Sequence, residues 1–210
     1  MYLSRVEIDD QNRQKVKDLT HLGAYHNWVE NSFPIEIDQG KRLRHLWRID
    51  RLHDKRFLLI VSSDKPNLDR LERYGVAGTA VTKNYQPFLE QIKNNEIMRF
   101  RLTANPTYRT NDKVYPHITV EQQKKWLLDR TNLAGFSIVK NGNGMLNFDI
   151  VNREWLVLYH HRRIRLSQVT FEGVLQVTDA EKINHTLIHG IGREKAYGMG
   201  MLTVIPIGIR

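Results

Sequence analysis

The sequence predicts an α+β protein made of two tandem ferredoxin-like domains, and two observations support this. Each half of the chain contains, in the same order, segments typical of strand, helix, strand, strand, helix and strand, which is the ferredoxin-like unit. The length of 210 residues suits two domains of roughly 100 residues each. A break in the pattern at residues 84–96, which contain Pro87, separates a first domain, 1–88, from a second, 89–210.

The elements of the first domain follow from the spacing of apolar residues, which is two in a strand and three or four in a helix. Residues 2–8 alternate and predict a strand, whereas the apolar residues of segment 12–22 have helical spacing. Residues 43–50 alternate again, and the apolar run 57–63 predicts a buried strand. The remaining elements are a turn at His53-Asp54, a helix capped by Ser63 or Asp64 and running to Tyr74, and a weak strand or loop over 75–81.

The second domain begins with the cleanest alternation in the chain, residues 97–104, and Asn105-Pro106 ends that predicted strand. Residues 120–133 predict a helix, and the turn Asn141–Gly144 predicts an extra hairpin. A second helix begins at the capping box Thr178–Glu181 and ends at Gly190. A bulge is expected between Leu166 and Val169 in the longest strand. The predicted strands are 136–139, 145–150, 155–159, 164–177 and 201–207.

The composition indicates a folded protein with an acidic partner. Apolar residues make up 40% of the chain and charged residues 26%, which excludes wholesale disorder. The net charge of +9 favours nucleic acid or an anionic surface as the partner. The absence of cysteine excludes disulfides and a thiolate zinc site. The start lacks the apolar core of a signal peptide, and no apolar run approaches ~20 residues. We therefore expect a soluble cytoplasmic protein without a membrane partner.

The most distinctive segment, residues 190–200, combines four glycines with two cations. Exposed backbone N–H groups beside Arg193 and Lys195 can form a phosphate cradle. The segment follows a helix and precedes a strand, unlike a dinucleotide-binding loop, and it lacks the P-loop Gly-Lys-Ser/Thr, so no cofactor is expected. The alternative is a merely flexible connection. The four glycines are Gly190, Gly192, Gly198 and Gly200.

A second basic cluster lies between two predicted strands and contains Arg162, Arg163 and Arg165. A hairpin tip with these side chains can enter an RNA groove or follow an RNA backbone. The alternative is a solvated loop, because most runs of charged residues lie in solvent-exposed loops. The net charge of the chain supports the RNA-binding interpretation.

Among nine histidines, His26 is the candidate for chemistry. If the first helix continues past Gly23, His26 joins an apolar stripe and a packing role follows. If the helix ends near Gly23, His26 can face a cleft and act in catalysis. His45 alternates with apolar residues, so packing is expected. His185 and His189 are four residues apart, but without the Glu of His-Glu-x-x-His or a carboxylate cluster we expect no metal site.

Five blocks of sequence, in one order from the first residue almost to the last, resemble a known family. They are Met1–Val6, Ala24–Trp28 with Phe33-Pro34, Leu46–Arg48, Phe100–Pro106 and Gly190–Leu202. Together they resemble the CasE family of CRISPR-associated endoribonucleases, the repeat-processing subunit of the type I-E Cascade complex. The glycine-rich block and the Arg-Leu-x-Ala-Asn-Pro block are the more specific pair.

The resemblance implies two tandem ferredoxin-like domains and metal-independent cleavage of precursor CRISPR RNA at the base of the repeat stem-loop. His26 matches the family's catalytic histidine, which follows the first helix. Gly23 stands where some members carry an assisting tyrosine, and Tyr25, which directly precedes His26, is the second catalytic candidate in this sequence. The arginine hairpin matches, in character, the hairpin that holds the RNA stem. The implied partners are the CRISPR repeat RNA stem-loop and other Cascade subunits.

The implied chemistry uses a nucleophile that RNA itself carries, the 2′-OH beside each phosphate. An unperturbed histidine titrates near pH 6.5 and can act as acid or base. The expected products carry a 2′,3′-cyclic phosphate, or the 3′-phosphate from its opening, and a 5′-OH. Two alternatives stay open: a non-catalytic RNA-binding subunit of the same fold, in which His26 packs, and a metal-dependent nuclease.

Overall fold

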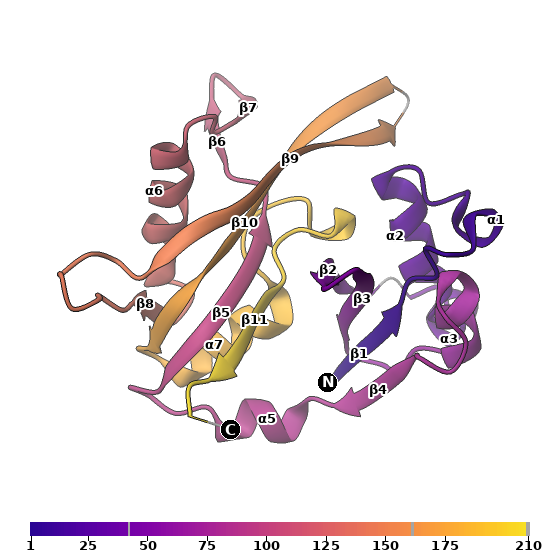
Figure 1. Ribbon diagram of the computed structural model, residues 1–210, viewed down its shortest axis with the longest axis horizontal. Coiled ribbons are helices and arrows are strands. Elements are labelled where there is room, and N and C mark those ends of the chain that lie inside the picture. The colour runs from indigo at the N-terminus through magenta and orange to yellow at the C-terminus, as the bar shows by residue number, and fades with distance from the viewer. Residues whose placement is uncertain (42, 161, 209–210) are drawn as a thin grey trace. The chain divides into compact units, whose positions relative to one another are not determined.

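The computed structural model describes residues 1–41, 43–160 and 162–208, and it describes no side chain in the range 159–163 (Figure 1). The chain folds into two compact units. The first unit comprises Met1–Phe88, Val157–Ile164 and Lys195–Gly198, and the second comprises Leu89–Leu156, Arg165–Glu194 and Met199–Arg210. Because the first unit also takes two later segments, the linear division into 1–88 and 89–210 stays a prediction.

The first unit is built on an antiparallel sheet with the strand order β2-β3-β1-β4. Alternate side chains of its central strands, such as Val6, Leu58 and Ile60, are fully buried, as the sequence pattern predicts. Its elements are β1 (Tyr2–Glu7), α1 (Arg13–Val16), α2 (Leu22–Asn31), α3 (Pro34–Asp38), β2 (Leu46–Leu52), β3 (Lys55–Ser62), α4 (Leu68–Leu71), the 3₁₀ turns η1 (Glu72–Tyr74) and η2 (Lys195–Tyr197), and β4 (Val81–Asn84).

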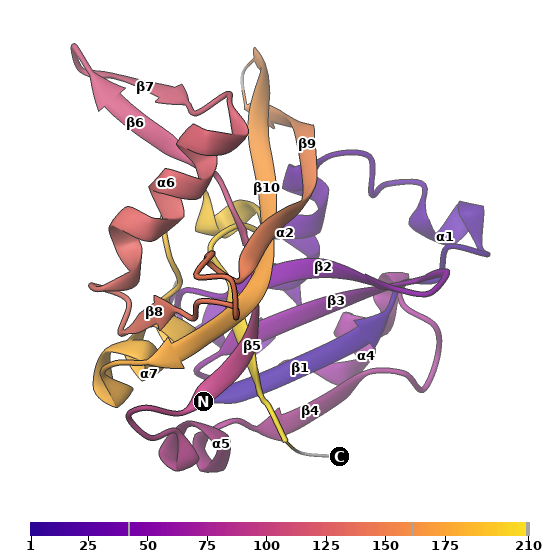
Figure 2. The same cartoon turned by 60° about the vertical axis from the view of Figure 1, so that its left-hand side comes forward.

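The second unit is built on a sheet with the order β11-β5-β10-β8, and β9 pairs with β10. Helices α6 and α7 lie on the same side of this sheet (Figure 2). Trp126 of α6 stacks on Phe171 of β10, with ring centroids 6.3 Å apart. The elements are β5 (Ile97–Ala104), β6 (Thr107–Thr110), β7 (Lys113–Pro116), α6 (Val120–Thr131), β8 (Phe136–Ile138), β9 (Phe148–His160), β10 (Arg162–Val177), α7 (Ala180–His189) and β11 (Leu202–Pro206).

Both sheets have the ferredoxin-like order. Counted along the chain within each sheet, the first strand lies between the fourth and the third, and the second strand lies at the edge beside the third. The predicted fold class of two tandem ferredoxin-like domains is therefore confirmed. The second unit carries two additions, the β6–β7 hairpin and the long strand β9. Helix α5 (Gln86–Gln91) lies in the segment where the sequence pattern breaks. None of the helices within the described ranges is both long and apolar enough to cross a membrane.

The predicted helix over 12–22 is wrong, and the difference decides where His26 lies. Helix α1 covers only Arg13–Val16, and the longer helix α2 begins at Leu22. The side chain of His21 accepts a hydrogen bond of 3.1 Å from the backbone N–H of Gly23 and caps α2. The helical spacing of apolar residues continues through both helices, but this cap starts a new helix at Leu22. His26 therefore lies inside a helix rather than in a junction after one.

Several other predicted boundaries are also wrong. Asn67, not Ser63 or Asp64, caps α4, because its side chain accepts from the backbone N–H of Arg70. Asp179, not Thr178, caps α7 by accepting from the backbone N–H of Lys182. In both cases a short Asn or Asp side chain supplies the acceptor that the first helical turn needs. The strands predicted over 145–150 and 155–159 are one strand, β9.

Candidate active site

His26 lies on α2 at the surface of the first unit, with 31% of its side chain exposed. Tyr197 of η2 meets the imidazole edge-on, with ring centroids 5.7 Å apart and an interplanar angle of 62°. The Nδ1 atom is buried and has no hydrogen-bond partner among the described residues. Glu30 lies one helical turn further on, with its Oε1 atom 4.0 Å from that nitrogen. The ring is thus partly open to solvent and is not sealed in the apolar core.

Tyr25, the second catalytic candidate, is directed elsewhere. Successive residues of a helix point about 100° apart. The Tyr25 hydroxyl accepts a hydrogen bond of 3.1 Å from Arg56, and the ring stacks on Trp47 at a centroid distance of 6.1 Å. Asp10 holds the Arg56 guanidinium through two oxygens, and this pairing raises the pKa of Arg56. The Tyr25 side chain is therefore bound to residues of the sheet, whereas the His26 ring is partly open to solvent.

Trp47 of β2 holds the η2 turn in place. Its indole N–H donates a hydrogen bond of 3.0 Å to the carbonyl oxygen of Ala196. Gly198 has a positive φ of +77°, and a Cβ atom there would lie only 2.6 Å from the Trp47 ring. Trp47 also stacks on Tyr25, so one side chain fixes both α2 and the turn that brings Tyr197 to His26.

The other three glycines of the segment belong to the second unit and shape its backbone. Gly190 ends α7 with a φ of 72°. Gly192 has a φ of +83°, and an added Cβ would lie 2.9 Å from Trp126. The backbone N–H of Gly200 donates to the carbonyl oxygen of Thr103 at 2.6 Å, so this amide is already used within the fold. The path of the segment is thus specified by packing at several of its glycines.

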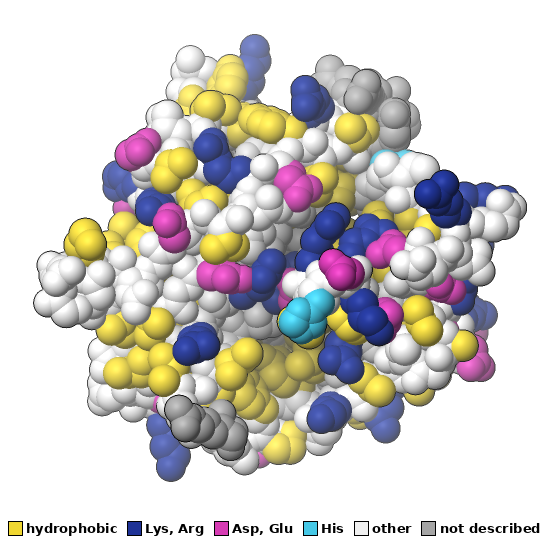
Figure 3. Space-filling model, in the orientation of Figure 1, with side chains coloured by type: hydrophobic (Ala, Val, Ile, Leu, Met, Phe, Trp, Pro, Cys, Tyr) yellow, Lys and Arg dark blue, Asp and Glu magenta, His cyan; other side chains and the backbone are white. Residues whose placement is uncertain are grey.

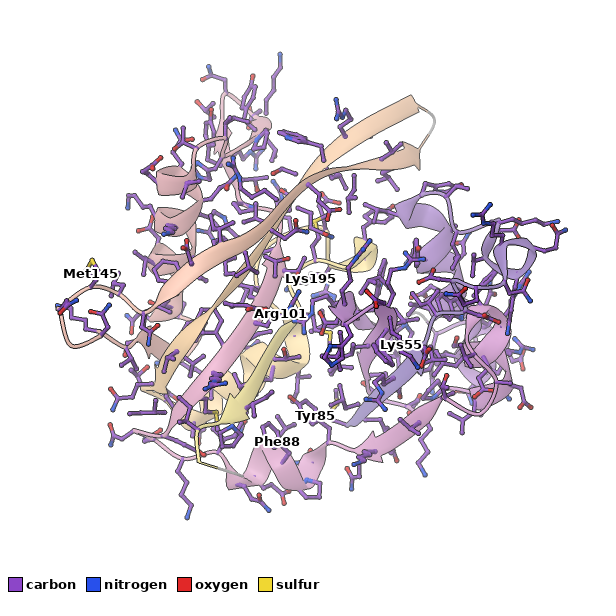
Figure 4. All side chains as sticks on the ribbon, in the orientation of Figure 1. Lys55, Tyr85, Phe88, Arg101, Met145 and Lys195 are labelled. Carbon is purple, nitrogen blue, oxygen red and sulfur yellow. The ribbon has the colours of Figure 1, made fainter. Side chains whose placement is uncertain are left out.

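Lys195 and Arg44 form a pair of like charges in the first unit. Lys195, labelled in Figure 4, begins η2, and Arg44 directly precedes the buried His45. Burial lowers the pKa of Lys195, and the charge of nearby Arg44 lowers it further. An anion between two such cations relieves their repulsion, so this pair suits a phosphate. Arg193, the other cation predicted in the segment, is exposed on the second unit.

The arginine cluster predicted at a hairpin tip lies at the start of β10. Arg162 and Arg163 are residues of this strand, but their side chains lie outside the described part of the chain. Arg165 is described and is exposed. Lys and Arg side chains, dark blue in Figure 3, recur over the viewed face with acidic side chains between them.

A buried ion cluster lies behind α2. His45, whose side chain is only 2% exposed, contacts Glu30 through Nδ1 at 2.9 Å and Glu36 through Nε2 at 3.2 Å. Phe33 stacks on the same ring at 3.9 Å, which confirms the predicted packing role. Ionised carboxylates only accept hydrogen bonds, so both ring nitrogens must donate. Burial lowers the pKa of His45, but the hydrogen bonds to Glu30 and Glu36 outweigh it and the pKa is raised above 6.5.

Residues 1–206 of the chain match the model of a family described as CRISPR associated protein. The chain belongs to this family. The CRISPR-associated endoribonuclease Cse3 of Thermus thermophilus is 27% identical over 216 residues, which cover 98% of this chain and 100% of that protein.

Two solved structures of CRISPR proteins share the fold of this family member. A structure of the CRISPR endoribonuclease Cse3 bound to 19 nt RNA has a TM-score of 0.85 at 26% identity, covering 98% of this chain and 100% of that one. A chain of a CRISPR RNA-guided surveillance complex has a TM-score of 0.65 at 21% identity, covering 99% and 100%, and shows the fold alone. The resemblance to the CasE family is confirmed.

Three polar residues of the buried ion cluster and the cation pair in this CRISPR-associated protein are not predicted from the sequence. Glu30 lies four residues after His26, a spacing that would have indicated contact if the helix had been placed at 22–31. Glu36 and Arg44 have no comparable signal, because their positions depend on how α3 and the segment before β2 fold back on α2.

His185 and His189 are neighbours on α7, with ring centroids 4.3 Å apart, and both are exposed. Within the ranges that the structure describes, no group of three or more His, Asp and Glu side chains is placed to hold a metal ion. Chelation is the experiment that decides whether the chemistry of this family member needs a metal.

The buried ion cluster predicts how stability depends on pH. Since the pKa of His45 is higher in the folded than in the unfolded chain, its stabilisation is complete below about pH 6.5 and is lost as the pH rises through the folded-state pKa. We expect the free energy of unfolding in urea to fall between about pH 6 and pH 9 by more in the wild type than in His45→Gln. Equal pH dependence in the two proteins would show that His45 is not charged in the folded state.

Proposed function

We propose that this protein is a metal-independent endoribonuclease that cleaves precursor CRISPR RNA at the base of the repeat stem-loop. The observation that supports it most is the setting of His26: a half-open imidazole meets Tyr197 of the same 3₁₀ turn that carries Lys195. An acid–base group and a cation pair thus belong to one small region of the first unit. The relative Cse3 is named an endoribonuclease, and its structure contains bound RNA.

The proposed reaction needs no nucleophile from the protein. The 2′-OH attacks the adjacent phosphorus, the P–O5′ bond breaks, and a 2′,3′-cyclic phosphate and a 5′-OH result. His26 exchanges the proton through Nε2, because Nδ1 is buried. It either takes the proton of the 2′-OH or gives one to the departing 5′-oxygen. Lys195 and Arg44 offset the charge that develops on the phosphate oxygens.

The proposal includes the partners that the family resemblance implies. After cleavage the protein stays on the mature guide RNA and docks with the other subunits of Cascade in the cytoplasm, where its RNA substrate is transcribed. A net charge of +9 supports tight retention of an RNA product. A chain of the same fold is found in a CRISPR RNA-guided surveillance complex.

Incubation of a labelled repeat RNA with the purified protein in EDTA tests this function. We expect a single cut at the base of the stem, at the same rate with EDTA as with Mg²⁺. RNA that is bound but intact after long incubation would support the non-catalytic RNA-binding subunit instead. Cleavage that stops in EDTA and returns with Mg²⁺ would support a metal-dependent nuclease.

The arginines at the start of β10 give a second test, on binding. Replacing Arg162, Arg163 and Arg165 together with alanine is expected to weaken stem-loop binding. If the three side chains neutralise phosphates, the slope of log K against log salt should also flatten by about 0.7–0.9 for each phosphate that the variant leaves unneutralised. Filter binding at several salt concentrations measures both quantities. Unchanged affinity and an unchanged slope would exclude this strand from the RNA interface.

A further inference from the structure

Glu30 lies between two histidines of different character. Its Oε1 atom accepts a hydrogen bond of 2.9 Å from Nδ1 of the buried His45 and lies 4.0 Å from Nδ1 of His26. About a third of the Glu30 side chain is exposed, whereas His45 and Glu36 are almost fully buried. One carboxylate therefore joins the buried ion cluster to the ring that faces solvent.

The buried cluster fixes the direction of the Glu30 carboxylate. The His45 ring stacks on Phe33 with an interplanar angle of 9°, and its other nitrogen is bound by Glu36. The ring therefore cannot turn without breaking contacts on two sides. Because the charged ring lies between two carboxylates, the cluster keeps one net negative charge. Glu30 is the member of the cluster next to His26, so the negative charge lies close to the Nδ1 atom of the partly exposed His26 ring.

The Nδ1 atom of His26 needs an acceptor such as Glu30. This nitrogen is buried and has no hydrogen-bond partner within the described ranges, so an RNA hydroxyl cannot reach it. An ionised carboxylate can only accept, so it favours the tautomer that carries the proton on Nδ1 and leaves Nε2 free. Because Glu30 is held by His45, a small rotation of the His26 side chain would bring the two atoms, now 4.0 Å apart, to hydrogen-bond length.

We propose that Glu30 is a positioning residue for His26: its carboxylate, held by His45 and Glu36, accepts the Nδ1 proton of His26 and leaves Nε2 to exchange a proton with the RNA. This inference rests on the proposed function, since it assigns a task within that reaction. Glu30 itself does not contact the reacting atoms.

Substitution of Glu30 separates positioning from folding. Glu30→Gln removes the charge and offers an amide N–H to His26, which favours the wrong tautomer. We expect the single-turnover cleavage rate to fall about 10- to 100-fold, the range found when the hydrogen-bond partner that orients a metal-bound histidine is removed. The Kd for repeat RNA should stay within about threefold of the wild type, because in this proposal Glu30 contacts His26 and not the RNA.

Glu36→Gln is the matched control, because it removes the other carboxylate of His45 and has no contact with His26. It should lower stability by at least as much as Glu30→Gln, since Glu36 is the more buried, yet slow cleavage clearly less than Glu30→Gln does, because Glu30 keeps its carboxylate and its hydrogen bond to His45. Glu30→Asp, which keeps a carboxylate, should cleave faster than Glu30→Gln. Glu30→Ala should regain activity in formate, since the site is partly open to solvent.

The ¹⁵N chemical shifts of the His26 ring give a readout that does not depend on activity. We expect a protonated Nδ1 in the wild type and Glu36→Gln, and a shift toward a protonated Nε2 in Glu30→Gln. If the wild type fails to cleave RNA, the proposed function is wrong, while the ring shifts still test the contact. The positioning role is overturned if folded Glu30→Gln cleaves like the wild type, if its His26 tautomer is unchanged, or if Glu36→Gln slows cleavage equally.

Discussion

Replacing His26 with alanine is expected to lower the rate of repeat cleavage by about 10²- to 10⁴-fold in EDTA, while binding of the repeat persists. The reason is that His26 is the partly exposed imidazole beside the cation-bearing turn η2. Its neighbour Tyr25 is engaged by Arg56 and Trp47. Single-turnover cleavage of a labelled repeat, with the Kd measured separately, checks this prediction.

His185→Ala is the matched control for this experiment. His185 is an exposed histidine on α7 of the second unit, and its loss should leave the cleavage rate unchanged. Full activity of His26→Ala would remove His26 from the mechanism. Loss of RNA binding together with cleavage would indicate that the ring holds the RNA and does not exchange the proton.

Replacing Gly198 with valine is expected to cost about 2–5 kcal/mol of stability and to abolish most of the cleavage activity. Gly198 has a φ of +77°, which a β-branched residue strongly disfavours. The added side chain would also meet the Trp47 ring, where a Cβ alone lies 2.6 Å away. Because Trp47 holds η2 through Ala196, the displaced turn would carry Tyr197 away from His26.

Gly142→Val controls for the general effect of adding a side chain. A Cβ at Gly142 meets no atom within 4 Å, so this variant should stay within about 0.5 kcal/mol of the wild type. Urea unfolding and the single-turnover rate are measured for both variants. A Gly198→Val protein with wild-type stability and activity would show that the contact with Trp47 has no part in forming the site.

The sheet is the part of the fold that the sequence predicts best, because alternation is a local pattern. The strand predicted over 97–104 is observed with the same bounds, and the strand over 57–63 differs only at its ends. Helix boundaries are less predictable, since single capping side chains decide them. The spacing of apolar residues runs unbroken through the region where His21 starts α2.

The site shows where sequence patterns stop being informative. His26 is found from a motif, but its environment depends on Tyr197, which is 171 positions further along the chain. The buried cluster of Glu30, Glu36 and His45 arises because α3 and the start of β2 fold against α2, and no spacing in the sequence encodes that contact. Nothing in the alternation around His45 indicates that its ring would be charged.

The chemical ends of a cleaved repeat test the central claim most directly. The repeat RNA is incubated with the wild-type protein in EDTA, and both products are analysed by mass spectrometry. Attack by the 2′-OH with proton exchange at His26 predicts a 2′,3′-cyclic phosphate or 3′-phosphate on one fragment and a 5′-OH on the other. A 3′-OH paired with a 5′-phosphate would contradict it, because those ends require water, and not the ribose, as the nucleophile.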